Sequence, residues 1–203
     1  MRLAGLAHLE TAGRLAGLGG VAMRAEEIQI ILRDGSRCLL RSPRPEDGEA
    51  VLRHLRRVAA ESPFTAFLPE EISNTLREEQ AFLKRQLVSP NRFMLAGFVE
   101  NRLIGLGAVG PAAANRKCGH RAELGLSIRR RWWGLGLGRA LVDGLCREAG
   151  RMGYERMELS VMEDNVRAVA LYESCGFERF GLLPDAYRTE GERQAAILMS
   201  KVL

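Results

Sequence analysis

Hydrophobic and polar positions along this chain follow two periods, one typical of strands and one typical of helices. Segments 28–32 and 38–41 have strand character, and Asp34-Gly35 between them is a strong hairpin signal. Further strands are predicted at 93–99, 103–109, 122–128, 157–162, 177–182 and 195–202. Helices are predicted after Pro43 and Pro45, with an apolar stripe from Val51 to Val58, and at 73–87, 139–152 and 166–174. This succession predicts an α/β (α+β) fold, with a mixed sheet flanked by helices.

Composition restricts the classes of protein that fit this pattern. The chain has 203 residues, 46% of them apolar, which is enough to bury one sizeable core. Its 30 basic residues are interspersed with 25 acidic ones, so the net charge of +5 does not indicate a nucleic-acid partner. Four cysteines without a C-x-x-C pair and only three histidines indicate neither a metal site nor a disulfide framework. A reducing, cytoplasmic setting fits best.

The first 22 residues differ from the rest of the chain. They are rich in Leu, Ala and Gly, but His8, Glu10 and Arg14 interrupt them, which makes a poor secretory signal. No apolar run approaches the roughly 18 residues of a membrane span, so no membrane association is expected. We expect residues 1–25 to be a disordered extension, or the product of a start chosen before Met23, and residues 26–203 to form the domain.

The most informative segment, 131–141, contains three alternating glycines, Gly134, Gly136 and Gly138. Glycines let a backbone approach a ligand closely, and the free amides that begin a helix attract anions. A P-loop would need Lys followed by Ser or Thr after the last glycine, but Arg139-Ala140 stands there. The dinucleotide fingerprint G-x-G-x-x-G is not satisfied either. The segment therefore predicts a phosphate-binding loop of another kind.

Two motifs resemble those of the GNAT superfamily of N-acetyltransferases. Trp133-x-x-Gly136-x-Gly138 is similar to motif A, Q/R-x-x-G-x-G/A, with Trp133 in place of the usual hydrogen-bonding residue. Ile128 precedes Trp133 by the offset that the family shows. The segment from Asn165 to Phe177 matches motif B, N-x-x-A-x-x-L-Y-x-x-x-G-F. The resemblance covers roughly residues 37–203 and implies a GNAT-like fold, with a single twisted, largely antiparallel sheet.

The resemblance implies acetyl-CoA as cosubstrate and no metal. The backbone amides of residues 134–139 would hold its pyrophosphate, and the strand at 126–128 would pair with its pantetheine arm. Asn165 has two roles open to it, as a helix N-cap and as a ligand for the cofactor's amide groups. The implied cofactor-binding residues are Leu126, Ser127, Ile128, Trp133, Gly134, Leu135, Gly136, Leu137, Gly138, Arg139, Asn165, Ala168 and Tyr172.

Acyl transfer to an amine requires two proton transfers. An alkyl amine with a pKa near ~10 must lose a proton before it attacks, and coenzyme A leaves as a thiolate whose conjugate acid has a pKa near ~8.5. The resemblance implies Tyr172 as the acid and Glu123 as the base, with Glu158, Glu163 or ordered water as alternatives. A backbone amide of the strand at 126–128 would stabilise the oxyanion. His120 is interpreted as a surface residue, and Cys175 lacks a histidine pattern to activate it.

The implied activity is direct acetyl transfer to a primary amine of a small molecule, an amino acid or a protein N-terminus. The family builds its acceptor pocket from regions that correspond here to 59–72, 111–119 and 185–193. Acidic residues in or beside these regions would suit a cationic amine: Glu61, Glu70, Glu71, Asp185, Glu190 and Glu192. A homodimer is compatible with the resemblance. The alternative is a non-catalytic GNAT-like module that binds acyl-CoA or has a regulatory role.

Overall fold

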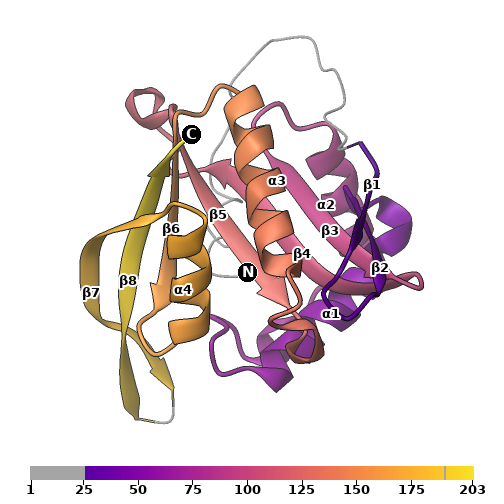
Figure 1. The fold of residues 1–203 in the computed structure, drawn as a ribbon, viewed down its shortest axis with the longest axis horizontal. Helices are drawn as coiled ribbons and strands as arrows, with labels where there is room; N and C mark the ends of the chain where they lie inside the picture. Colours follow the sequence, from indigo (N-terminus) through magenta and orange to yellow (C-terminus); the bar gives the residue numbers. More distant parts are fainter. Residues whose placement is uncertain (1–25, 190) are drawn as a thin grey trace.

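A single eight-stranded sheet forms the centre of the part of the chain that the structure describes (Figure 1). This computed structural model describes residues 26–189 and 191–203, so the prediction for residues 1–25 lies outside it. The strands lie in the order β1-β2-β3-β4-β5-β6-β8-β7, and only β5 and β6 are parallel neighbours. Their bounds are β1 (Ile28–Ile31), β2 (Arg37–Arg41), β3 (Phe93–Val99), β4 (Arg102–Pro111), β5 (Arg121–Ile128), β6 (Arg156–Met162), β7 (Glu178–Thr189) and β8 (Glu192–Val202). The predicted mixed, largely antiparallel sheet is confirmed.

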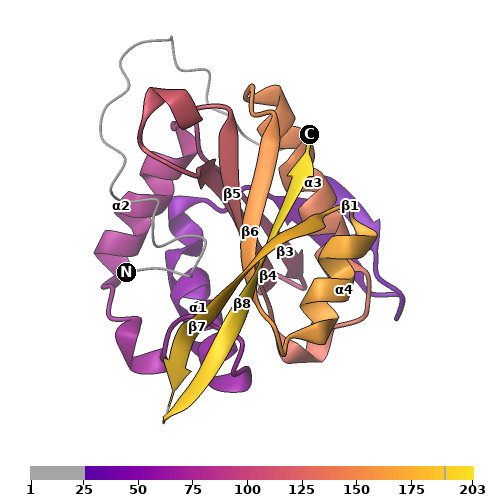
Figure 2. The same cartoon turned by 90° about the vertical axis from the view of Figure 1, so that its left-hand side faces the viewer.

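Two pairs of helices cover the two faces of the sheet. Helices α1 (Gly48–Glu61) and α2 (Leu76–Leu87) lie on one face, and α3 (Leu137–Arg151) and α4 (Val166–Ser174) lie on the other (Figures 1 and 2). Helix α2 begins three residues later than predicted, because Thr75 and Glu78 form a capping box that fixes its start. No helix in the described ranges is long and apolar enough to cross a membrane.

Helix α3 packs closely against β4. A Cβ on Gly107 would lie 2.5 Å from Leu145, and one on Gly105 would lie 2.9 Å from Leu137. These glycines therefore let α3 approach the sheet more closely than any side chain would permit. Leu137, Leu141 and Leu145 are completely buried as a result. This contact fixes the position of the first turn of α3 relative to the strands.

The sheet opens where its two parallel strands diverge. Strand β5 pairs with β6 only over Arg121–Glu123 and Arg156–Glu158. Beyond these residues β5 continues to pair with β4, while β6 continues to pair with β8. The carboxyl-terminal halves of β5 and β6 therefore form a fork.

Candidate active site

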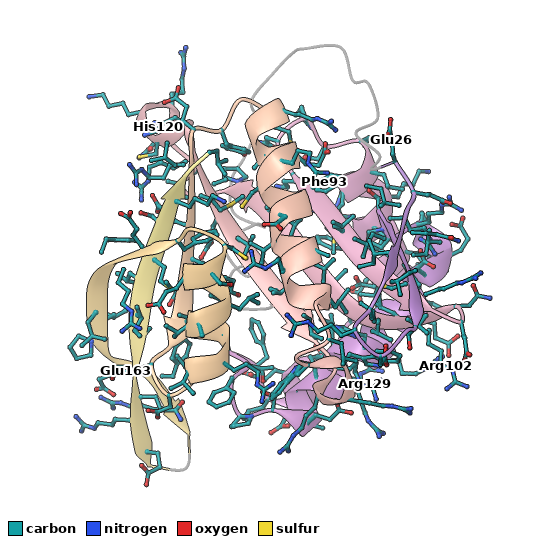
Figure 3. All side chains as sticks on the ribbon, in the orientation of Figure 1. Glu26, Phe93, Arg102, His120, Arg129 and Glu163 are labelled. Carbon is teal, nitrogen blue, oxygen red and sulfur yellow. The ribbon has the colours of Figure 1, made fainter. Side chains whose placement is uncertain are left out.

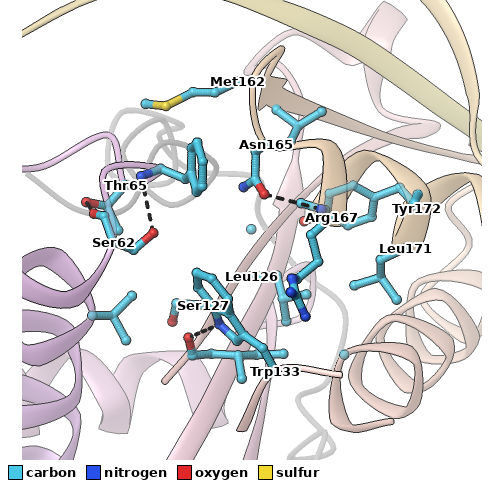
Figure 4. A pocket seen from close by; sticks show the side chains of 18 of the residues that line it. Ser62, Thr65, Leu126, Ser127, Trp133, Met162, Asn165, Arg167, Leu171 and Tyr172 are labelled. Carbon is cyan, nitrogen blue, oxygen red and sulfur yellow. Dashed lines mark hydrogen bonds between the residues drawn. The ribbon is translucent and has the colours of Figure 1, made fainter. Parts of the chain in front are cut away.

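A cavity of about 450 Å³ lies in this fork (Figure 4). Leu124–Ile128 of β5 form one wall and Ser160–Met162 of β6 form the other. Most of the predicted cofactor-binding residues line it: Leu126, Ser127, Ile128, Trp133, Gly134, Gly136, Gly138, Arg139, Asn165, Ala168 and Tyr172. Leu135 and Leu137 are exceptions, because they pack against or within the hydrophobic core instead. The two sequence motifs, which lie some distance apart in the chain, therefore meet at one cavity.

The glycine-rich loop adopts a conformation that only glycine takes readily. Gly134 has a φ of +78° and Gly136 a φ of +95°, both in the left-handed region. Gly136 is the N-cap of α3, and a Cβ placed on it would meet no atom within 4 Å. The first turn of α3 therefore begins beside open space, with N–H groups that have no acceptor within the helix. This arrangement suits a bound phosphate.

Three arginines add positive charge to the cavity. Arg33, Arg139 and Arg167 line it, and no carboxylate belongs to its lining within the described residues. Arg33 comes from the turn between β1 and β2, where its Nη1 donates to the carbonyl of Gly134 at 3.3 Å. Its backbone N–H also donates to the carbonyl of Leu135 at 3.1 Å. The hairpin signal predicted the turn, but no signal in the sequence linked Arg33 to a loop 101 positions away.

Trp133 replaces the usual residue of motif A and performs a different task. Its indole Nε1 donates to the carbonyl of Ile128 at 2.8 Å, which ties the glycine loop to the end of β5. The guanidinium of Arg167, on α4, lies 5.5 Å from the centre of its ring. Trp133 therefore packs against β5 and contributes to the cavity lining (Figure 4).

Helix α4 contributes Asn165 and Tyr172. The Oδ1 atom of Asn165 accepts the N–H of Ala168 at 3.2 Å, which confirms the predicted N-cap. Tyr172 lines the cavity from the same helix and is only 7% exposed. Burial raises the pKa of its phenol well above the ordinary value, so the hydroxyl stays protonated and can donate.

Strand β5 directs backbone donors into the fork. Arg129 donates its N–H to the carbonyl of Ile104 on β4. Since N–H groups alternate in direction along an antiparallel strand, those of Leu126 and Ile128 point away from β4 and toward the gap. The side chain of Ser127 faces α1, where its Oγ lies 3.0 Å from Nε2 of the buried His54. Burial lowers the pKa of His54 to about 4 and keeps its ring neutral.

Glu123 lies at the closed end of the fork, one position before Leu124, which lines the cavity. Burial, together with the negative charge of Glu158, raises the pKa of Glu123 to about 7. Glu158 itself is held by Arg121, with both contacts at 2.6 Å. Glu163 and His120 are exposed, and Figure 3 shows both at the periphery of the molecule.

The cavity residues that come from outside the two motifs, apart from Arg33 and Arg139, are neutral rather than acidic. Phe64 and Thr65 approach from the segment after α1, and Met162 and Tyr187 approach from β6 and β7. Residues of segments 59–72 and 185–193 therefore line the cavity. Segment 111–119 does not, because it precedes β5 and lies at the end where β5 and β6 are still paired.

The acidic residues that would suit a cationic amine do not line the cavity within the described residues. Burial would raise the pKa of Glu61, but hydrogen bonds from Arg129, Arg57 and the N–H of Arg130 lower it to about 2. Asp185 is paired with Arg188. Each of these carboxylates is therefore paired with an arginine that does not line the cavity.

The family model described as "Acetyltransferase (GNAT) family" matches residues 52–177, which include both motifs and the fork. The chain belongs to the GNAT acetyltransferase family. Its structure is similar to that of a GNAT-family acetyltransferase from Streptococcus pneumoniae, with 30% identity, a TM-score of 0.77, and coverage of 82% of this chain and 99% of the other.

More distant similarities extend the comparison of this GNAT protein. The yncA protein of Salmonella typhimurium, solved with its cofactor acetyl-CoA, shares the fold at 19% identity and a TM-score of 0.72, over 82% of this chain and 94% of that one. The ribosomal protein bS18-alanine N-acetyltransferase of Escherichia coli is 40% identical over 65 residues. That match spans 32% of this chain and 44% of the relative.

Proposed function

We propose that residues 26–203 form an N-acetyltransferase domain that transfers the acetyl group of acetyl-CoA directly to a primary amine. The observation that carries this proposal is the fork cavity, which joins a glycine loop and three arginines on one side to a neutral lining on the other. An anionic donor fits the first side, and an amine can approach from the second. Acetyl-CoA supplies the activated acyl group when it is bound.

Different parts of the cavity lining bind different parts of acetyl-CoA in this proposal. The first turn of α3, with Arg33 and Arg139, holds the pyrophosphate. The backbone N–H of Leu126 orients the thioester carbonyl and stabilises the oxyanion as the amine attacks. Asn165 already uses its Oδ1 as an N-cap, which leaves its side-chain NH₂ group free to bind the cofactor's carbonyls.

Proton transfer falls to two residues, Glu123 and Tyr172. Glu123 accepts the proton of the attacking amine through ordered water, since its side chain is not part of the cavity lining. Tyr172 donates its proton to the departing thiolate. The pKa of Glu123, about 7, suits a base at neutral pH. Burial keeps the hydroxyl of Tyr172 protonated, so its proton is available when the thiolate forms.

The neutral acceptor side favours an amine whose neighbouring atoms carry no charge. The N-terminal amine of a polypeptide with a small first residue meets this condition. Alanine, the residue that the name of the Escherichia coli relative specifies, is one such residue. A polyamine or an aminoglycoside fits less well, because the lining offers no carboxylate within the described residues.

Thermal unfolding with and without acetyl-CoA tests the proposed cosubstrate. At about 100 times its dissociation constant, acetyl-CoA is expected to stabilise the protein by roughly 2.7 kcal/mol and to raise Tm by several degrees. ATP and NAD serve as controls and should give smaller shifts. An absent shift would contradict the proposed cosubstrate. A clear shift without thiol release from any amine would favour the non-catalytic alternative.

The pH dependence of kcat tests Glu123 as the base. Because only the carboxylate form accepts a proton, kcat should rise with pH through about 7. Glu123→Gln is expected to remove this rise of kcat with pH and to lower kcat by somewhat less than about 100-fold, since ordered water can partly substitute.

Glu158→Gln is the matched control. Loss of the negative charge of Glu158 should lower the pKa of Glu123 and move the rise of kcat to lower pH. An unchanged profile in Glu123→Gln would exclude this residue as the base.

A further inference from the structure

A second groove, of about 930 Å³, lies on the outer side of α1, between this helix and the start of α2. Arg53, Arg56 and Arg57 line it from α1, and Arg129 lines it from the residue after β5. Leu52 and Leu76 add apolar surface. Nothing in the proposed acetyl transfer uses this groove.

The arginines of the groove carry more positive charge than their carboxylate partners neutralise. Glu61 is shared between Arg57 and Arg129. Arg53 pairs with Glu49, but both side chains are more than two-thirds exposed, which makes the pair weak. The Nε of Arg56 donates to the backbone carbonyl of Ile72 at 3.2 Å. A backbone carbonyl has no net charge, so the positive charge of Arg56 is not neutralised by this contact.

The groove and the fork cavity lie on different sides of the same two segments of the chain. On α1, Arg57 lines the groove and the next residue, Val58, lines the cavity. At the end of β5, Ile128 lines the cavity and the next residue, Arg129, lines the groove. Glu61 connects the two elements through its contacts with Arg57 and Arg129. An extended ligand that leaves the cavity and passes around α1 therefore reaches the arginines.

We propose that this groove binds acidic side chains of a polypeptide acceptor whose N-terminal amine enters the fork cavity. The inference rests on the proposed function and defines its substrate as a protein or peptide with an acidic stretch near its N-terminus. Guanidinium groups bind carboxylates through paired hydrogen bonds, so Arg53 and Arg56 select the acceptor by charge. Since a helix is about 10 Å across and an extended chain advances about 3.3 Å per residue, roughly three to five residues separate the amine from the first acidic side chain.

The composition of the groove favours a peptide over a nucleic acid. Glu49 and Glu61 lie among the arginines and would repel a continuous phosphate backbone. No aromatic side chain belongs to the lining within the described residues, so a base has no surface on which to stack. Leu76, which is 44% exposed, offers contacts to the apolar side chains of a peptide.

Matched peptides test the proposal. Pairs of synthetic peptides beginning with Ala, Ser or Met carry either glutamate or glutamine at roughly the fourth to seventh positions. Thiol release from acetyl-CoA reports the rate. The glutamate peptide should have a kcat/KM about tenfold higher, through KM rather than kcat, and added salt should reduce the preference. Arg53→Gln combined with Arg56→Gln should reduce the preference to about 1.

Arg85→Gln removes an exposed positive charge on α2 outside the groove and is the matched control. It should leave the preference intact. Equal rates for the two peptides of every pair would overturn the inference while leaving the proposed function in place. Acetylation of small amines but of no peptide would also overturn it. Absence of acetyl-CoA binding would instead defeat the proposed function itself. RNA binding that is lost in the double variant, with no peptide preference, would assign the groove to nucleic acid and reject the inference.

Discussion

Tyr172→Phe is expected to lower kcat by about 100-fold while changing the dissociation constant of acetyl-CoA by less than about twofold. The substitution removes only the hydroxyl of a side chain that is 7% exposed and lines the fork cavity. If that hydroxyl protonates the departing thiolate, its loss raises the barrier of this step without affecting binding. Steady-state thiol release together with calorimetric titration of acetyl-CoA measures both quantities.

Tyr154→Phe is the matched control for this variant. Tyr154 is also 7% exposed, but its hydroxyl donates to the carbonyl of Asn91 at 2.8 Å, and it does not line the cavity. Its loss should cost about 1 kcal/mol of stability and leave kcat unchanged. Wild-type turnover in Tyr172→Phe would remove Tyr172 from the mechanism, whatever its effect on stability.

Gly136→Glu is expected to abolish acetyl-CoA binding, seen as loss of the Tm shift. The new side chain would project into the open space beside the first turn of α3, where the pyrophosphate is proposed to lie. Its negative charge would repel the ligand, and a φ of +95° would add strain of about 1–2 kcal/mol.

Gly153→Glu separates the local effect from backbone strain. Gly153 has a φ of +87°, and a Cβ there would also meet no atom within 4 Å, but it follows the far end of α3 and is absent from the cavity lining. This variant should lose similar stability and retain the acetyl-CoA shift. Binding that survives in Gly136→Glu would mean that the phosphate lies elsewhere.

The features that the sequence predicted well are encoded by contiguous residues. The glycine loop needs left-handed backbone at Gly134 and Gly136, and the N-cap of α4 needs the short side chain of Asn165, so both can be identified locally. The alternation of apolar residues similarly located the strands of the sheet. The parallel pairing of β5 with β6 and the divergence of these strands join separate segments, so no local pattern in the sequence records them.

The features that the sequence did not predict depend on contacts between distant segments. Arg33 reaches the glycine loop only because the first hairpin folds against it. Acidic residues in the predicted acceptor segments suggested a cationic amine, but Glu61 is paired with Arg129, 68 positions away in the chain. Strand β7 continues to Thr189, beyond the predicted end at Leu182, because it stays paired with β8. Its second half lacks an alternation of apolar residues, so the sequence pattern did not show this extension.

The fork also bears on how the sheet holds together. Past Glu123 and Glu158, no ladder of the described strands joins β1–β5 to β6, β8 and β7, and the close approach of α3 to α4 at Gly138 is one of the contacts that bridge the halves. A pantetheine arm that is hydrogen-bonded to β5 on one side and to Asn165 on the other would fill this gap, in the position that an additional strand would occupy. The edge of β5 that faces the gap would then have hydrogen-bond partners only while the donor is bound. Each release of coenzyme A would leave β5 and β6 joined only by their short paired segment.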